Sequence, residues 1–163
     1  MFSDRLNDYI KKLAEGEFYD IGGGEQPIHQ YGNAMDMKLS TALAKNCTVV
    51  DCLDEEEVQT VMPFDQFKFS ASSYVTADMD KHIDIEPKPM VIVKDALCWF
   101  DHAQGYENVL RMVQDNGMII VVDNAYVIKE FREYAKNRMF TFDEWHYPFC
   151  QGCGEDGPSN CKE

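Results

Sequence analysis

Glu17-Phe-Tyr-Asp-Ile-Gly-Gly-Gly-Glu25 is the stretch of sequence on which the predicted fold depends. Its apolar run, residues 18–21, predicts a short strand, and three glycines follow directly. Glycine lacks a Cβ, so the backbone can turn sharply there and approach a ligand closely. A strand that leads into such a turn is typical of ligand sites at the carboxyl ends of parallel strands. Asp20, near the strand's end, could fix the turn by accepting backbone N–H groups or could meet a cationic ligand.

Strand and helix patterns alternate along the whole chain. The apolar runs at 90–93 and 118–122 are continuous, as expected of strands covered on both faces. This alternation predicts an α/β fold: a Rossmann-like, doubly wound, mostly parallel sheet with helices on both faces. Further strands are expected over 48–50 and 67–78, helices over 4–15, 34–45, 54–62, about 105–115 and 126–138, and a turn at Asn116-Gly117.

Length and charge narrow the class of partner. The 163 residues predict one domain, residues 1–147, followed by a Cys-rich tail, residues 148–163. A net charge of −14 repels nucleic acid, so DNA is not expected as a partner, whereas a small molecule or a protein with a basic surface is. The sequence has no long apolar run and no signal-peptide core, so we expect a cytoplasmic protein without a membrane span. A compact acidic chain also fits a viral source.

Several motifs occur in a defined order between residues 17 and 145. They are the glycine turn Asp20-Ile-Gly-Gly-Gly24, the strand ends Val49-Val-Asp51 and Tyr74-Val-Thr-Ala-Asp78, the segment Met90-Val-Ile-Val-Lys-Asp95, the helix and strand Val109 to Asp123, and Phe140-Thr-Phe-Asp-Glu-Trp145. In this order and spacing the chain resembles a class I S-adenosylmethionine-dependent methyltransferase.

The resemblance implies S-adenosylmethionine as cofactor and a role for each motif. The glycine turn would cradle the methionine part, the acid after the second strand would accept the ribose hydroxyls, and the acid after the third strand would lie near the adenine. Two residues compete for the ribose, Asp51 and Asp36, because Gly22 and Asp51 are further apart than the family's usual gap of about 20 residues. The implied cofactor-binding residues are Asp20, Gly22, Gly23, Gly24, Asp51, Asp36, Asp78, Met79 and Lys94.

The sequence after the fourth strand does not indicate methylation of a base or amide nitrogen. Lys94-Asp95-Ala96-Leu97 stands where that class carries D/N-P-P-Y/F. Asp95 and His102 are the candidate catalytic residues, each as a general base toward a hydroxyl or carboxyl acceptor.

The sequence after Trp145 is too short for the hairpin that closes the sheet of full family members, so we expect that hairpin to be reduced or missing. Two functions therefore stay open. One is a methyltransferase acting on a small molecule or a protein side chain. The other is an inactive methyltransferase-like module with an assembly, structural or regulatory role in binding a protein partner.

The tail carries a Cys-x-x-Cys pair. Cys150 and Cys153, with Cys161 and His146, could form a four-ligand zinc site. A second Cys-x-x-Cys pair is missing, so the alternatives are a tail with exposed thiols or, in an oxidising compartment, one disulfide.

Overall fold

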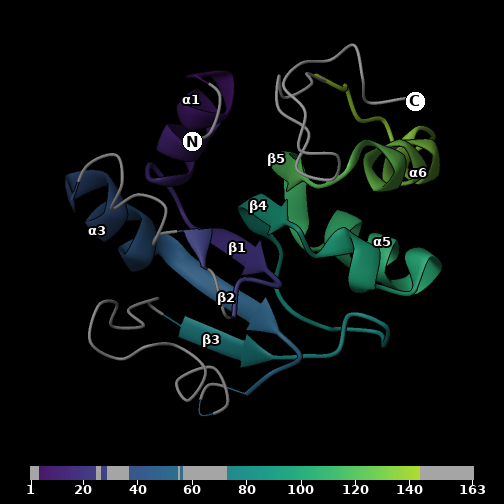
Figure 1. Cartoon of the computed structure of the whole chain (residues 1–163), viewed down its shortest axis with the longest axis horizontal. Coiled ribbons are helices and arrows are strands. Elements are labelled where there is room, and N and C mark those ends of the chain that lie inside the picture. Colours follow the sequence, from purple (N-terminus) through teal and green to yellow (C-terminus); the bar gives the residue numbers. More distant parts are fainter. Residues whose placement is uncertain (1–3, 25–26, 29–36, 55, 57–72, 144–163) are drawn as a thin grey trace, which may run out of the picture.

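Five parallel strands form a single sheet in this computed structural model, which describes residues 4–24, 27–28, 37–54, 56 and 73–143 (Figure 1). The strands lie in the order β3-β2-β1-β4-β5. Their bounds are Phe18–Ile21 (β1), Cys47–Asp51 (β2), Ser73–Thr76 (β3), Lys88–Lys94 (β4) and Val113–Val122 (β5). The predicted doubly wound α/β sheet is therefore confirmed.

Strand β1 occupies the middle of the sheet and pairs with two strands. Phe18 lies opposite Cys47 of β2 on one side and opposite Met90 of β4 on the other. The chain therefore winds outward in one direction through β2 and β3 and then returns to build β4 and β5. The reversal leaves a crevice at the carboxyl ends of β1 and β4, where folds of this type bind ligands.

Helices cover both faces of the sheet (Figure 1). Helices α1 (Asp4–Leu13) and α3 (Met37–Asn46) pack on one face, and α5 (His102–Arg111) and α6 (Ala125–Ala135) pack on the other. Successive side chains of a strand point to opposite faces, so each central strand contributes to two cores. In β4, for example, Ile92 packs with α1 and α3, whereas its neighbours Val91 and Val93 pack with α5 and α6.

Several boundaries differ from those expected from the sequence, and two of the differences have a clear physical cause. Helix α5 starts at His102, because the Asp101 side chain caps it by accepting the N–H of Ala103. The turn expected at Asn116-Gly117 does not precede the last strand but lies within it. Val113 pairs with Lys88 and Met118 with Met90, so the residues between them form a bulge, in which Asn116 has φ +61°.

A short 3₁₀ helix, η1 (Leu97–Trp99), was not predicted and follows β4. The helix expected over 54–62 and the first part of the strand expected over 67–78 lie largely outside the described residues, as does the chain after Asp143. Within the described part, no strand follows α6. No helix there is long and apolar enough to span a membrane.

Helix α5 packs so closely on the segment before it that Gly105 has no room for a side chain. A Cβ at Gly105 would collide with the Cβ of Phe100 and lie 2.9 Å from its ring. Gly105→Ala should therefore lower the free energy of unfolding by about 1–3 kcal/mol through overpacking. Helix propensity alone predicts a gain of about 1 kcal/mol instead.

Urea unfolding measures the sign of this change. The control is Ala103→Gly at an exposed position of the same helix, which changes propensity without changing packing and should cost at most about 1 kcal/mol. A Gly105→Ala protein more stable than the wild type would contradict the close contact with Phe100.

Candidate functional site

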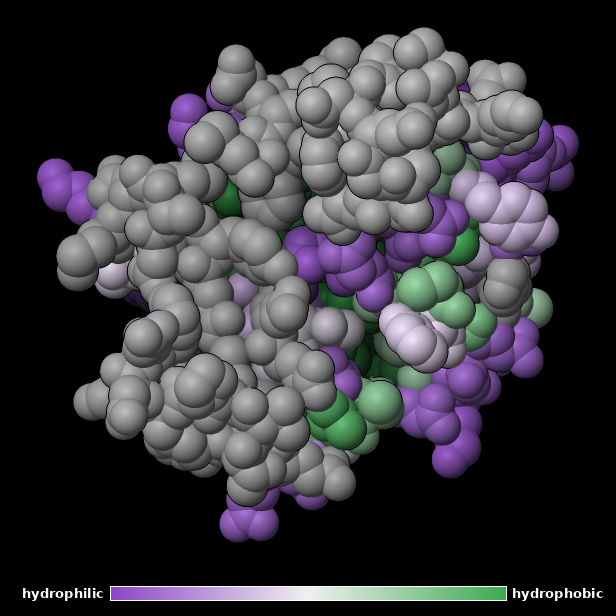
Figure 2. Space-filling view, in the orientation of Figure 1, coloured by the Kyte–Doolittle hydropathy of each residue, from purple (hydrophilic) through white to green (hydrophobic). Residues whose placement is uncertain are grey.

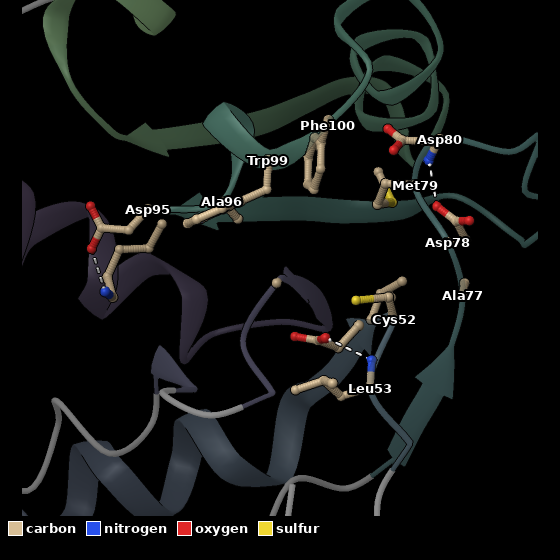
Figure 3. A pocket seen from close by; sticks show the side chains of 14 residues that line it. Cys52, Leu53, Ala77, Asp78, Met79, Asp80, Asp95, Ala96, Trp99 and Phe100 are labelled. Atoms are coloured by element: carbon tan, nitrogen blue, oxygen red, sulfur yellow. Dashed lines mark hydrogen bonds and ion pairs between the residues drawn. The ribbon is translucent and has the colours of Figure 1, made fainter. Parts of the chain in front are cut away.

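A cavity of about 330 Å³ opens where the strand order reverses. Figure 3 shows it walled by the residues that follow β2 and β3 and by the segment that follows β4. On the molecular surface, hydrophobic side chains lie in this hollow and hydrophilic ones border it (Figure 2). The lining residues are Gly22, Val50, Asp51, Cys52, Leu53, Ala77, Asp78, Met79, Asp80, Lys94, Asp95, Ala96, Trp99 and Phe100.

The glycine turn has no room for side chains. Gly22 has φ +72°, a conformation that favours glycine, and a Cβ there would collide with Ala96. A Cβ on Gly23 would lie 2.5 Å from the carboxyl carbon of Asp20. The N–H of Gly22 donates to the carbonyl of Val50 at 2.8 Å, which ties the start of the turn to β2. Bare backbone therefore forms this side of the cavity.

Asp20 lies in the core beneath the turn and is not a lining residue of the cavity. It is 2 % exposed, and its Oδ2 accepts the N–H of Ile28 at 2.6 Å. Burial raises the pKa of Asp20 from 3.8 to about 7, although the hydrogen bond from Ile28 and the charge of Lys94 act in the opposite direction; Asp51 raises it further. Asp20 therefore packs beneath Gly23 and ties the backbone of Ile28 to β1.

Asp51 ends β2 and lines the cavity. Its Oδ2 accepts the N–H of Gly24 at 2.9 Å, and its Oδ1 accepts the N–H of Leu53 at 3.0 Å. Each carboxylate oxygen retains a further lone pair for a ligand hydroxyl. Asp51 therefore joins the glycine turn to the second strand, which is the place expected of a ribose-binding acid. The competing candidate, Asp36, lies outside the described residues.

The loop after β3 brings Asp78 and Met79 to the same cavity, as the resemblance implied. Met79 is buried, whereas Asp78 is exposed and accepts the N–H of Asp80 at 3.0 Å. Sequence reasoning missed Asn108, which is 1 % exposed on α5 and donates to the carbonyls of Met79 and Lys81. The sequence did carry one sign of a buried polar residue, because Asn108 directly precedes the apolar Val109 and Leu110 in a predicted helix.

Lys94 and Asp95 form an ion pair at the end of β4. The Lys94 Nζ lies 2.7 Å from Asp95 Oδ2, and the lysine side chain is 9 % exposed. Asp95 has φ +52°, and its N–H donates to the carbonyl of Val122 at 2.7 Å. Of the two catalytic candidates, Asp95 lines the cavity. His102 is the first residue of α5, and its side chain lies outside what the structure describes.

Sequence reasoning also missed the aromatic wall that η1 provides. Trp99 and Phe100 line the cavity opposite Cys52 and Leu53 (Figure 3). Trp99 is 81 % exposed, so a large flat surface is available beside the opening. No sequence pattern predicted η1, since a three-residue helix has no apolar periodicity.

Negative charge dominates the described lining. Four lining residues are aspartates, namely Asp51, Asp78, Asp80 and Asp95, and one is a lysine, Lys94. Such a lining favours a cationic ligand and disfavours a phosphate. Among the residues that the structure describes, no group of three His, Cys, Asp or Glu side chains could hold a metal ion. His146, Cys150, Cys153 and Cys161 lie outside those residues, so the zinc site stays a prediction.

The raised pKa of Asp20 predicts a pH-dependent stability. Between about pH 4 and about pH 7 the folded protein retains a proton that the unfolded chain has released. The contribution of Asp20 to the free energy of unfolding therefore falls as the pH rises through this range, by an amount on the order of a few kcal/mol. Asp20→Asn removes the titrating group, so the wild type should lose stability relative to this variant as the pH rises.

Urea unfolding of both proteins at several pH values from about pH 4 to about pH 7 measures the difference. Asp84→Asn, at an exposed aspartate, is the matched control. Parallel pH profiles of the wild type and Asp20→Asn would contradict the burial of this carboxyl group.

Comparison with known proteins establishes the fold. No family model matches the sequence, and no curated protein matches it. Among solved structures, the chain is similar to the N-methyltransferase NodS from Bradyrhizobium japonicum WM9 in complex with S-adenosylhomocysteine, with a TM-score of 0.50 and 15 % identity over 79 % of this chain and 72 % of that chain. The chain thus has the α/β fold of class I S-adenosylmethionine-dependent methyltransferases.

Proposed function

We propose that the protein binds S-adenosylmethionine in the crevice between β1 and β4 and transfers its methyl group to a small molecule or a protein side chain. The observation that carries the proposal is the position of Asp51. Its carboxylate lies at the carboxyl end of β2, lines the cavity and contacts the glycine turn. A carboxylate in this place can accept both hydroxyls of a ribose, as in dinucleotide-binding sites.

The residues of the cavity fit the parts of this cofactor. Gly22 lines the cavity without a Cβ, so the methionine part can approach its backbone closely. Ala77, Met79 and Phe100 offer an apolar slot for the adenine, and the carboxylate of Asp78 can accept from its amino group.

The charge of the lining supports the same assignment. The sulfonium and the amino group of S-adenosylmethionine are cationic, and the aspartates of the cavity would attract them. The cofactor supplies an activated methyl group, and its transfer is an in-line displacement. The protein therefore contributes chiefly by aligning the two reactants and excluding water. Asp95 and His102 remain the candidate general bases for an acceptor hydroxyl or carboxyl group.

One observation favours the second candidate function, an inactive module that binds a protein partner. The ion pair with Lys94 stabilises the charged form of the Asp95 carboxylate, which makes Asp95 a weaker base toward an acceptor. The net charge of −14 would also suit a basic partner. Cofactor binding without methyl transfer to any acceptor would support this candidate.

Titration calorimetry with S-adenosylhomocysteine tests the cofactor assignment. The wild type should bind, and Asp51→Asn should weaken binding about 10- to 100-fold, because it removes the charge that strengthens the ribose hydrogen bonds. The matched control is Asp115→Asn, at an exposed aspartate of the β5 bulge that does not line the cavity. A wild type that does not bind would refute the proposed function.

A competition experiment separates this cofactor from a dinucleotide. The pyrophosphate of NAD would face the lining aspartates, so a large excess of NAD should leave the affinity for S-adenosylhomocysteine unchanged. Displacement of S-adenosylhomocysteine by NAD would point instead to a dinucleotide site.

A further inference from the structure

We propose that Asn108 is a positioning residue that holds the loop after β3 in its cofactor-binding conformation, an inference that rests on the proposed function. Asn108 lies in the last turn of α5, and it reaches the backbone of residues 79–83. That loop carries Met79, which lines the cavity where the adenine would bind.

The loop depends on partners outside itself. Residues 77–87 form no strand or helix, although Met79 within them is buried. Buried backbone carbonyls require hydrogen-bond donors. Asn108 provides two, because its Nδ2 donates to the carbonyl of Met79 at 2.9 Å and to that of Lys81 at 2.7 Å. Its Oδ1 accepts the N–H of Ile83 at 3.4 Å.

Every hydrogen-bonding position of the Asn108 side-chain amide has a partner. Its Oδ1 also accepts from Nε2 of Gln104, one turn earlier on α5, at 3.2 Å. Both N–H groups and both acceptor positions are therefore occupied, so the network defines which way the amide faces. An aspartate of the same shape could not replace it, because the oxygen in the place of Nδ2 would face two carbonyl oxygens.

A second attachment joins the loop to the start of α5. The N–H of Asp101, the residue that caps α5, donates to the carboxylate of Asp80. Asp80 in turn donates its own N–H to Asp78. The loop is thus attached both to the residue that caps the start of α5 and to Asn108 near its end. Met79 is bonded directly to Asn108, and its neighbour Asp80 is bonded to Asp101. Rigid elements place binding groups more accurately than mobile loops do.

The choice of residue is unfavourable for the helix itself. Asparagine has low helix propensity, and its buried amide must be fully paired. Leucine, which has a similar branched shape and a higher helix propensity, would favour the helix. A residue that opposes the local preference is expected where a functional requirement exists, and here that requirement is the position of the loop.

The test compares Asn108→Leu with the wild type by titration calorimetry. The ligands are S-adenosylhomocysteine and its deaminated analogue S-inosylhomocysteine, which lacks the amino group of adenine. The variant should bind S-adenosylhomocysteine about tenfold more weakly, since a displaced loop loses about one well-placed hydrogen bond. The preference of the wild type for the adenine ligand over the inosine ligand should also shrink. A merely structural role would leave that ratio unchanged in folded protein.

Gln104→Ala is the matched control. It removes one donor to the Oδ1 of Asn108 and leaves both bonds to the loop carbonyls, so affinity should change less than about twofold. Asn108→Asp is a second variant and should lose both the affinity and the preference, as Asn108→Leu does. Circular dichroism confirms that each variant is folded at the temperature of the titration.

Each outcome bears on a different statement. A wild type that does not bind S-adenosylhomocysteine refutes the proposed function. A wild type that binds, together with folded Asn108 variants of equal affinity and equal preference, overturns only the role of Asn108. Hydrogen exchange of the ligand-free wild type gives an answer even if the variants do not fold. The N–H of Ile83, the loop amide that donates to Asn108, should exchange as slowly as the middle of α5, and rapid exchange there would overturn the proposal.

Discussion

Parallel pairing of β1 with both β2 and β4 is the constraint on which the rest of the structure depends. Strands that run in the same direction need crossover connections, so the chain must leave the sheet after β1 and return twice. Because the two halves wind in opposite directions from β1, a crevice forms at the carboxyl ends of β1 and β4. The cavity lies there, and each neighbouring strand ends at its rim.

Two carboxylates bind the backbone of the glycine segment beside this crevice in different ways. Asp20 is buried beneath the glycine turn and accepts the N–H of Ile28, whereas Asp51 faces the cavity and accepts that of Gly24. Burial of Asp20 is unfavourable for its charged form, and this is the reason for its raised pKa. The turn is therefore shaped from below by a group that no ligand reaches and from the side by a group that a ligand can contact.

The sequence predicted the central strands and the helices on both faces of the sheet. Continuous apolar runs such as 90–93 identify strands that are buried on both faces. Sequence reasoning failed where pairing between strands overrides local preference. Asn116-Gly117 has the composition of a turn, yet the pairing of Val113 with Lys88 retains it inside β5. The capping of α5 by Asp101 and the short helix η1 likewise depend on contacts that no periodicity reveals.

For the site, the sequence by itself determined which residues end the strands: Gly22 after β1, Asp51 at β2, Asp78 after β3 and Lys94 at β4. Parallel strands place their carboxyl ends at one edge, so motif order alone brings these residues together. Only the tertiary structure decided that Asp20 lies in the core, that Lys94 pairs with Asp95, and that Asn108 holds the loop beside the cavity. These contacts join residues distant in sequence or depend on burial, and both are set by how the helices pack on the sheet.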